Sequence, residues 1–249
     1  MPEADAPQPL LDPWVQESNL DGASGETPFP DMPNPPHSPD KAALRRHLRQ
    51  LRKEIAADHR HVAGLCLVRL ALRHHLLGKG RRIGIYMPAK NEIDVLPLLN
   101  RALAMRSSCF LPIVPPAGHK RMWFSQVGDH PAWQLNRYGI PEYLHPMAKQ
   151  VRAQYLDIIF LPLLGFDSRG YRLGMGGGYY DASLSYLRRF RRWRRPRVIG
   201  VAFAAQEVQR VPNDAWDIPL NAILTEQSFK RFHQSDRDWH PPNIDKLGY

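Results

Sequence analysis

The chain has 249 residues, of which 43% are hydrophobic and 23% are charged, a composition typical of a globular protein with one substantial core. It contains 34 Lys and Arg against 24 Asp and Glu, which gives a formal net charge of +10. Its two cysteines, Cys66 and Cys109, have neither metal-ligand spacing nor the pattern of a disulfide framework. These features exclude a small disulfide-stapled scaffold and favour a reduced compartment.

Residues 1–40 differ in composition from the rest of the chain. They contain ten prolines and eight acids but no Lys or Arg, and they show no apolar periodicity. We expect a disordered acidic tail, because such a segment buries too little apolar surface to offset the entropy lost on ordering. Residues 41–249 then carry a net charge of +18. This body should attract anions such as nucleic acid, anionic membrane, or phosphorylated and polycarboxylate small molecules.

The sequence shows no membrane span and no secretory signal. The N-terminus lacks a positive region followed by an apolar stretch, and the longest nearly apolar run, Ile158 to Phe166, is far too short to cross a bilayer. We therefore expect a cytoplasmic protein that does not insert into membranes.

Helical and strand patterns alternate after the tail. Leu44, Leu48, Leu51 and Ile55 recur at helical spacing in a strongly basic segment, which Asp40 is placed to cap. Further helices are predicted over 61–77, 92–106 and about 180–193, and strands over 81–88, 109–114, 122–127, 156–164, 197–203 and 221–226.

This alternation predicts an α/β fold of three layers, in which a mostly parallel sheet is flanked by helices in a Rossmann-like arrangement. The continuous apolar character of 156–164 suits a strand that is covered on both faces. We expect the tail of residues 1–40, a single domain over 41–232 and a polar C-terminal extension over 233–249.

The stretch RLGMGGGYYD, Arg172 to Asp181, has the composition of a phosphate-binding loop. It lies between a buried strand and a helix, where open α/β sheets bind ligands. Glycines let the backbone approach phosphate oxygens, and an Arg can add a charged hydrogen bond. The stretch matches neither G-x-x-x-x-G-K-[ST] nor G-x-G-x-x-G, because Tyr179 stands where the second pattern needs a glycine. A flexible turn is the alternative interpretation.

The longer segment LPLLGFDSRGYRLGMGGGYYD, residues 161–181, resembles the signature of the 5-formyltetrahydrofolate cyclo-ligase family, also called methenyltetrahydrofolate synthetases. The similarity covers about residues 41–226, and KAALR, IYMPAKNEID, NRYGIPE and WDIPLNAILTE follow in the family's order. The resemblance implies that ATP phosphorylates the formyl oxygen of 5-formyltetrahydrofolate. A neighbouring folate nitrogen then closes the ring, which gives 5,10-methenyltetrahydrofolate, ADP and phosphate.

The same resemblance implies which residues bind ATP and Mg²⁺. The residues assigned to ATP are Lys41, Arg45, Arg172, Leu173, Gly174, Met175, Gly176, Gly177, Gly178, Tyr179 and Tyr180. Mg²⁺ would be held by Asp181 and by Asp217, which we prefer to Asp214 because it occupies the acid position of WDIPLNAILTE. Without the resemblance, the two cations of the first helix read as a solvated basic face, and Asp181 as an acid favoured at a helix start.

For the folate, the resemblance assigns Glu92 to the N–H groups of the pterin ring and Met87 to the wall of the same pocket. Tyr138 would stack on the substrate ring. The alternatives are a surface or helix-capping acid for Glu92 and a core aromatic for Tyr138. Two departures from the family are Asn221, where many relatives have Asp, and Tyr143, where Pro is common.

The run RRFRRWRRPR, Arg188 to Arg197, contains seven arginines and does not belong to the family's segments. Such a run suits a nucleic-acid or polyanion patch, or a polyglutamate tail on folate, although we favour a solvated helix end. The competing function is therefore a nucleotide- or RNA-binding protein on the same scaffold. A third is an enzyme for another N-formyl substrate. We expect 5-formyltetrahydrofolate and ATP as partners of a monomer, in preference to nucleic acid.

Overall fold

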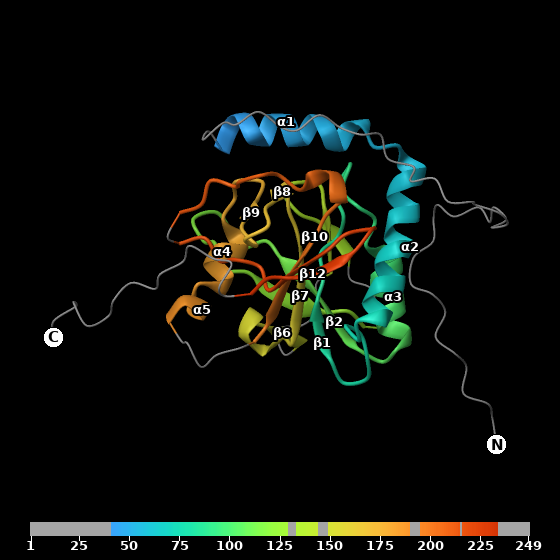
Figure 1. Ribbon diagram of the computed structural model, residues 1–249. Helices are drawn as coiled ribbons and strands as arrows, with labels where there is room; N and C mark the ends of the chain where they lie inside the picture. Colours follow the sequence, from blue (N-terminus) through green and yellow to red (C-terminus); the bar gives the residue numbers. More distant parts are fainter. Residues whose placement is uncertain (1–40, 129–132, 144–148, 190–194, 215, 234–249) are drawn as a thin grey trace, which may run out of the picture. The chain divides into compact units, whose positions relative to one another are not determined.

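The computed structural model describes residues 41–128, 133–143, 149–189, 195–214 and 216–233 (Figure 1). All of these residues belong to one compact unit. The expected tail and nearly all of the expected C-terminal extension lie outside the described residues, so the predicted domain boundaries stay predictions. The same holds for the middle of the Arg188–Arg197 run. No helix within the described ranges is long and apolar enough to cross a membrane.

A mixed eight-stranded sheet lies at the centre, with the strand order β12-β11-β10-β7-β1-β2-β3-β6. Its parallel strands are β1 (Arg82–Gly84), β2 (Ser108–Ile113), β7 (Ile158–Pro162), β10 (Arg197–Val201) and β11 (Ala222–Leu224). Its antiparallel pairings involve β3 (Trp123–Gln126), β6 (Gln150–Val151) and β12 (Phe229–Arg231). The mostly parallel sheet predicted from the sequence is confirmed.

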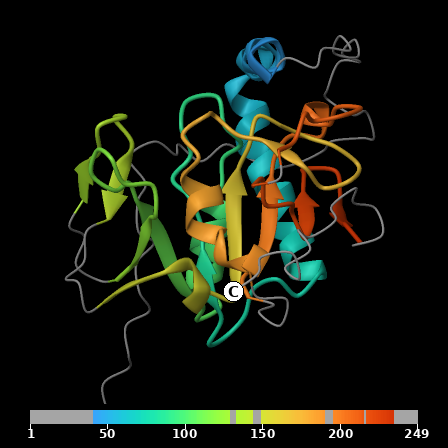
Figure 2. The ribbon, with the colours of Figure 1, turned by 90° about the vertical axis from the view of Figure 1, so that its left-hand side faces the viewer.

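Helices cover both faces of this sheet (Figures 1 and 2). One face carries α2 (Ala57–Arg73) and α3 (Leu96–Ala104), and the other carries α4 (Tyr179–Leu184) and α5 (Tyr186–Arg189). The predicted three layers are therefore present. Helix α1 (Lys41–Glu54) instead lies across the edge at which the parallel strands end, and the arrow of β7 points toward it.

Apolar packing explains this arrangement. The side chains of Ile158 to Leu161 in β7 are buried, as expected for a strand covered on both faces. Ile159 and Leu161 join a cluster that includes Phe110, Leu184 and Val198. A second cluster anchors α1 through Leu44 and Leu48, which pack with Leu164, Tyr171, Leu173, Val208 and Val211. The helix is thereby fixed above the loops that follow β7 and β10.

Several predicted boundaries are wrong, and each has a local cause. Helix α2 was expected to reach Leu77, but it ends at Arg73 because His75 adopts a left-handed φ of 52°. Helix α3 was expected from Glu92 and begins at Leu96, where Asp94 Oδ1 accepts from Leu96 N and Pro97 occupies the first turn. The late start leaves Glu92 in a loop.

Two small hairpins were not predicted. Strands β4 (Trp133–Leu135) and β5 (Pro141–Tyr143) pair in one, and β8 (Gly165–Phe166) and β9 (Arg172–Leu173) pair in the other. The second hairpin places Arg172 in a strand directly before the glycine run.

Candidate active site at the carboxyl ends of the strands

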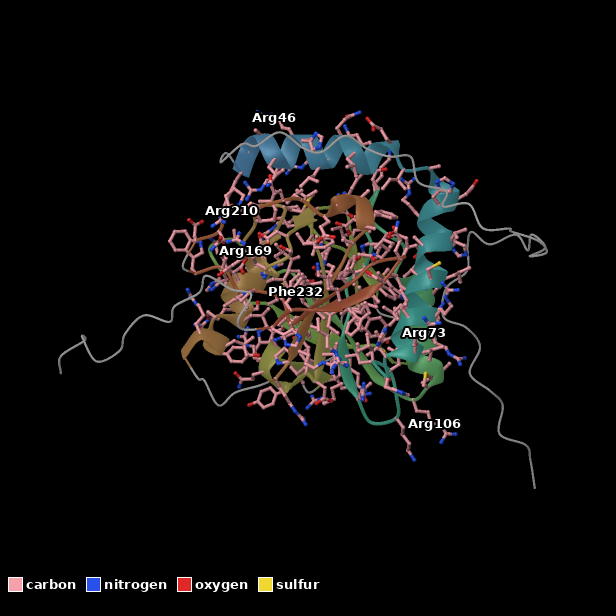
Figure 3. The ribbon with its side chains drawn as sticks, in the orientation of Figure 1. Arg46, Arg73, Arg106, Arg169, Arg210 and Phe232 are labelled. Carbon is pink, nitrogen blue, oxygen red and sulfur yellow. The ribbon has the colours of Figure 1, made fainter. Side chains whose placement is uncertain are left out.

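Four basic residues of α1 contact the loops at the carboxyl ends of the strands. They are spaced by four, four and three residues, which places them along one stripe of a helix: Lys41, Arg45, Arg49 and Arg52. Arg46, by contrast, lies on the outer side of α1 (Figure 3) and is exposed. The predicted basic helix therefore has one face that contacts these loops and one face that is exposed to solvent. The predicted ATP ligands Lys41 and Arg45 lie on the face that contacts the loops.

Lys41 lies at the start of α1 and contacts two carboxylates. Its Nζ is 2.5 Å from Asp214 Oδ2 and 3.2 Å from Asp217 Oδ2. Burial lowers the pKa of Lys41, but both carboxylates act against burial, and the pKa is raised overall. Asp217 Oδ2 also accepts from Asp214 N at 2.8 Å. A predicted ATP ligand and a predicted metal ligand are thus brought together, while Asp214, the less favoured candidate for the metal, makes the shorter contact.

Arg172 and Asp181 form a second charged contact, which is less exposed. Arg172 Nη2 lies 2.6 Å from Asp181 Oδ1, and the Arg172 side chain is 5% exposed. Arg172 Nη1 donates to the carbonyl of Ile218, whose N–H donates to Asp181 Oδ1 at 3.1 Å. The pair therefore ties the glycine run to the segment that carries Asp217.

The glycine run itself is open to solvent. Its residues Met175 to Gly178 are exposed, and Gly176 and Gly178 have φ angles of 110° and 68° that only glycine adopts freely. A Cβ at either position would meet nothing within 4 Å. Arg45 Nε donates to Gly174 O at 3.0 Å, which holds the run against α1. The backbone is therefore shaped, anchored and accessible, as a phosphate-binding loop requires.

Glu92 lies on the other side of the site, in the loop between β1 and α3. Its Oε1 is 3.3 Å from Arg52 Nη1, and its Oε2 accepts from Ala89 N at 2.9 Å. Burial, followed by the charge of Glu92, raises the pKa of Tyr86 and of Tyr180. Glu92 is buried, so the surface-acid interpretation is wrong. Met87, which follows Tyr86, is partly buried at the start of this loop.

Tyr138 lies at the turn between β4 and β5 and is exposed, so the core-aromatic interpretation is wrong. Its hydroxyl is 2.8 Å from the hydroxyl of Tyr179, to which Arg137 Nη2 also donates at 2.5 Å. Hydrogen bonds from Tyr179 and Arg137 lower the pKa of Tyr138. Asn136 Oδ1 accepts from Tyr138 N and from Ile140 N and so shapes the turn. The hairpin therefore meets the first residue of α4 beside the glycine run.

Among the described residues, no group of three or more His, Cys, Asp and Glu is arranged to hold a metal ion. The two predicted metal ligands are nevertheless linked by one hydrogen bond. Ile218, the residue after Asp217, donates its N–H to Asp181 Oδ1. Mg²⁺ usually keeps several waters and takes one or two carboxylates together with phosphate oxygens. Two carboxylates beside an exposed glycine run fit that requirement.

Three contacts of the site were not foreseen from the sequence. Arg52 pairs with Glu92, Arg137 bonds to Tyr179, and Asp214 holds Lys41. Only Arg52 gave a usable signal, because it continues the helical stripe of Lys41 and Arg45.

Comparison with known proteins shows the family of the chain. The model of the 5-formyltetrahydrofolate cyclo-ligase family matches residues 37–226. A 5-formyltetrahydrofolate cyclo-ligase of Haemophilus influenzae is 30% identical over 184 residues, which cover 73% of this chain and 95% of that protein. The Mus musculus protein of the same description is 27% identical over 197 residues, covering 76% of this chain and 94% of its own.

Solved structures show the same fold. The 5,10-methenyltetrahydrofolate synthetase of Aquifex aeolicus superposes with a TM-score of 0.65 at 26% identity, covering 82% of this chain and 98% of its own. The corresponding protein of Mycoplasma pneumoniae gives a TM-score of 0.57 at 23% identity, with coverage of 75% and 99%. The chain therefore belongs to the 5-formyltetrahydrofolate cyclo-ligase family, and 5-formyltetrahydrofolate cyclo-ligase is the enzyme activity that this membership gives it.

Proposed function

We propose that the enzyme converts 5-formyltetrahydrofolate and ATP to 5,10-methenyltetrahydrofolate, ADP and phosphate. The γ-phosphoryl group passes to the formyl oxygen, which makes the formyl carbon electrophilic. The neighbouring folate nitrogen then attacks that carbon, and loss of phosphate completes the ring. No covalent nucleophile of the protein is needed, so the chain must supply positioning and neutralisation of charge.

In this proposal the triphosphate lies along the stretch from Leu173 to Tyr180, in which Met175 to Gly178 are exposed. Lys41 and Arg45 extend from α1 to the same place, where they contact Asp214 and Gly174 O respectively. Both contacts are partly exposed and can be exchanged for phosphate oxygens. Lys41 carries a positive charge at all physiological pH values because its pKa is raised.

The role that we propose for Arg172 differs from the direct binding of ATP phosphates expected from the sequence. Its guanidinium is almost fully buried and already bonds to Asp181 and Ile218 O. We propose that it orients Asp181 and adds positive charge beneath the glycine run. Asp181 and Asp217 would hold Mg²⁺, and the bound ion would neutralise charge on the phosphate oxygens during transfer.

The pterin ring lies, in the same proposal, against the loop after β1. Both oxygens of Glu92 accept from its N–H groups, Met87 contacts the ring, and Tyr138 covers it from the β4–β5 turn. Tyr138 also bonds to Tyr179 of the glycine run. The hairpin can therefore bring the formyl group and the γ-phosphate together and exclude water between them. We further propose that the enzyme acts as a monomer in the cytoplasm.

One observation carries the proposal: a single face of α1 contacts the glycine run at Arg45 and the Glu92 loop at Arg52. The test is a spectrophotometric assay in which purified enzyme, 5-formyltetrahydrofolate and Mg-ATP are mixed and the near-ultraviolet absorbance of the methenyl product is followed. Product should grow only with ATP and fail with Asp181→Ala. A flat trace from folded wild-type protein that binds ATP would refute the proposal.

A further inference from the structure

A buried pair of opposite charges joins α1 to the loop that follows β1. Arg52 Nη1 is 3.3 Å from Glu92 Oε1, and the two side chains are 6% and 7% exposed. Arg52 belongs to the last turn of α1, whereas Glu92 lies between β1 and α3. The reaction proposed above uses Glu92 but gives Arg52 no task.

Stability alone does not explain this pair. Two charges removed from water lose hydration energy, and well-packed apolar side chains in their place are often at least as stable. Arg52 Nε is also buried and has no hydrogen-bond partner among the described residues. A buried donor without a partner is unfavourable and commonly marks a place for a ligand or an ordered water. Both features indicate a binding role.

The carboxylate of Glu92 is held from two sides. Arg52 contacts one oxygen, and Ala89 N donates to the other at 2.9 Å. Each carboxylate oxygen can accept more than one hydrogen bond, so both can still accept from a ligand. The phenols of buried Tyr86 and partly buried Tyr180 lie within electrostatic reach of Glu92, whose charge contributes to raising the pKa of both. A flat ring with neighbouring N–H groups fits such a place.

We propose that Arg52 is the positioning residue for folate recognition: its guanidinium balances the charge of Glu92 and fixes the carboxylate so that both oxygens face the pterin N–H groups. This inference rests on the proposed role of Glu92 and extends it to α1. Without Arg52, Glu92 retains a buried charge with no cation beside it and turns toward water. Folate binding then weakens, while the glycine run keeps its shape.

The first test compares KM values of the wild-type enzyme and Arg52→Met. The variant should raise KM for 5-formyltetrahydrofolate by between about tenfold and a hundredfold, as expected when a hydrogen bond to a charged group is lost. Its KM for ATP should change by less than about twofold. Arg52→Lys keeps the charge and should restore part of the folate affinity. A fall in kcat with both KM values unchanged would overturn the inference.

A double-mutant cycle separates positioning from a merely structural role. If Arg52 acts through Glu92, Arg52→Met should add little to the rise in folate KM that Glu92→Gln causes. Leu51→Ala is the matched structural control, because Leu51 is a buried neighbour in the same turn of α1. It should lower the melting temperature and leave the ratio of the two KM values unchanged. Independent effects of the Arg52 and Glu92 variants would contradict positioning.

The inference can be judged even if the proposed function fails. Direct binding of 5-formyltetrahydrofolate by calorimetry needs no turnover, so it applies to an inactive wild-type protein as well. Arg52→Met should then raise the dissociation constant for 5-formyltetrahydrofolate by between about tenfold and a hundredfold. Unchanged binding by the folded variant, or no binding by the wild-type protein, would overturn the role of Arg52.

Discussion

The two ends of α1 contact the site in different ways. At the start of the helix, the side chains of Lys41, Asp214 and Asp217 are 28%, 42% and 20% exposed. At its end, Arg52 and Glu92 are both less than 10% exposed. Exposed ion pairs contribute about 0–1 kcal/mol and exchange partners readily, whereas removing one partner of a buried pair costs about 3–5 kcal/mol. Under the proposed function, the Lys41 end, assigned to the nucleotide, can therefore exchange its partners for phosphates, while the Arg52 end, assigned to the folate, is formed in advance.

The Arg172–Asp181 pair joins a buried guanidinium to a partly exposed carboxylate beside the glycine run. Activity should therefore be most sensitive to substitution of Arg172. We expect Arg172→Met to lower kcat by between about a hundredfold and a thousandfold, the usual effect of losing one preorganised charged contact. Steady-state assays with saturating folate and ATP measure this effect.

Arg169→Met is the matched control for that variant. Arg169 is 13% exposed and lies 2.7 Å from the fully buried Asp167, so its removal also breaks a buried charged contact. It should lower the melting temperature at least as much as Arg172→Met and keep more than about a tenth of the activity. Equal loss of activity in the two variants would show that Arg172 acts through stability alone.

Substitutions of Asp217 and Asp214, the two carboxylates that contact Lys41, should have different effects on activity. Asp217→Asn removes a proposed metal ligand, so we expect the Mg²⁺ concentration for half-maximal activity to rise by about tenfold or more. Asp214→Asn frees Lys41 from its closer partner at 2.5 Å. It should leave the Mg²⁺ dependence unchanged and lower KM for ATP by about twofold to threefold. If Asp214→Asn raises the required Mg²⁺ concentration and Asp217→Asn does not, Asp214 is the metal ligand.

A smaller effect is expected within the glycine run. Gly176→Ala and Gly178→Ala place a Cβ at φ angles of 110° and 68°, which should cost about 1–2 kcal/mol each and raise KM for ATP by about tenfold. Gly174→Ala is the control, because its Cβ would meet nothing within 4 Å and its φ is not in the left-handed range. If all three variants behave alike, the shape of the run is unimportant.

The sequence allowed the features at the start of α1 to be predicted more fully than the contact at its end. The glycine run and the helical stripe of Lys41 and Arg45 are local patterns, and local patterns follow from backbone geometry. The meeting of Arg52 and Glu92 joins residues 40 positions apart. It depends on α3 starting at Leu96, a boundary that the hydrophobic period placed too early.

Long-range packing also accounts for the other misses. The β4–β5 hairpin has three-residue strands, too short for a periodic signal, and its meeting with Tyr179 is set by the whole fold. Asp214 and Asp217 lie three residues apart, and no local rule says that both contact Lys41 or which of them makes the shorter contact. Family resemblance supplied the roles of these segments, but their mutual contacts required the three-dimensional structure.

The contrast between exposed and buried contacts also applies to the pKa values of the tyrosines, for which we expect the smallest effect on activity. Hydrogen bonds from Tyr179 and Arg137 lower the pKa of Tyr138 from its ordinary value of 10. Burial and the charge of Glu92 raise the pKa of Tyr86 and of Tyr180. As the pH rises toward 10, Tyr138 should therefore lose its proton before Tyr86 and Tyr180.

For Tyr138 the folded pKa lies below the unfolded value, so its contribution to stability is fully present above the unfolded pKa and is lost as the pH falls through the folded pKa. A titration of phenolate absorbance on the folded enzyme should show an early component that Tyr138→Phe removes. KM for folate should rise by less than about threefold in this variant, because Phe keeps the ring face and loses only the hydroxyl. If the early component persists in Tyr138→Phe, it does not belong to Tyr138, and the hydrogen bonds at the β4–β5 turn do not lower the pKa of that phenol.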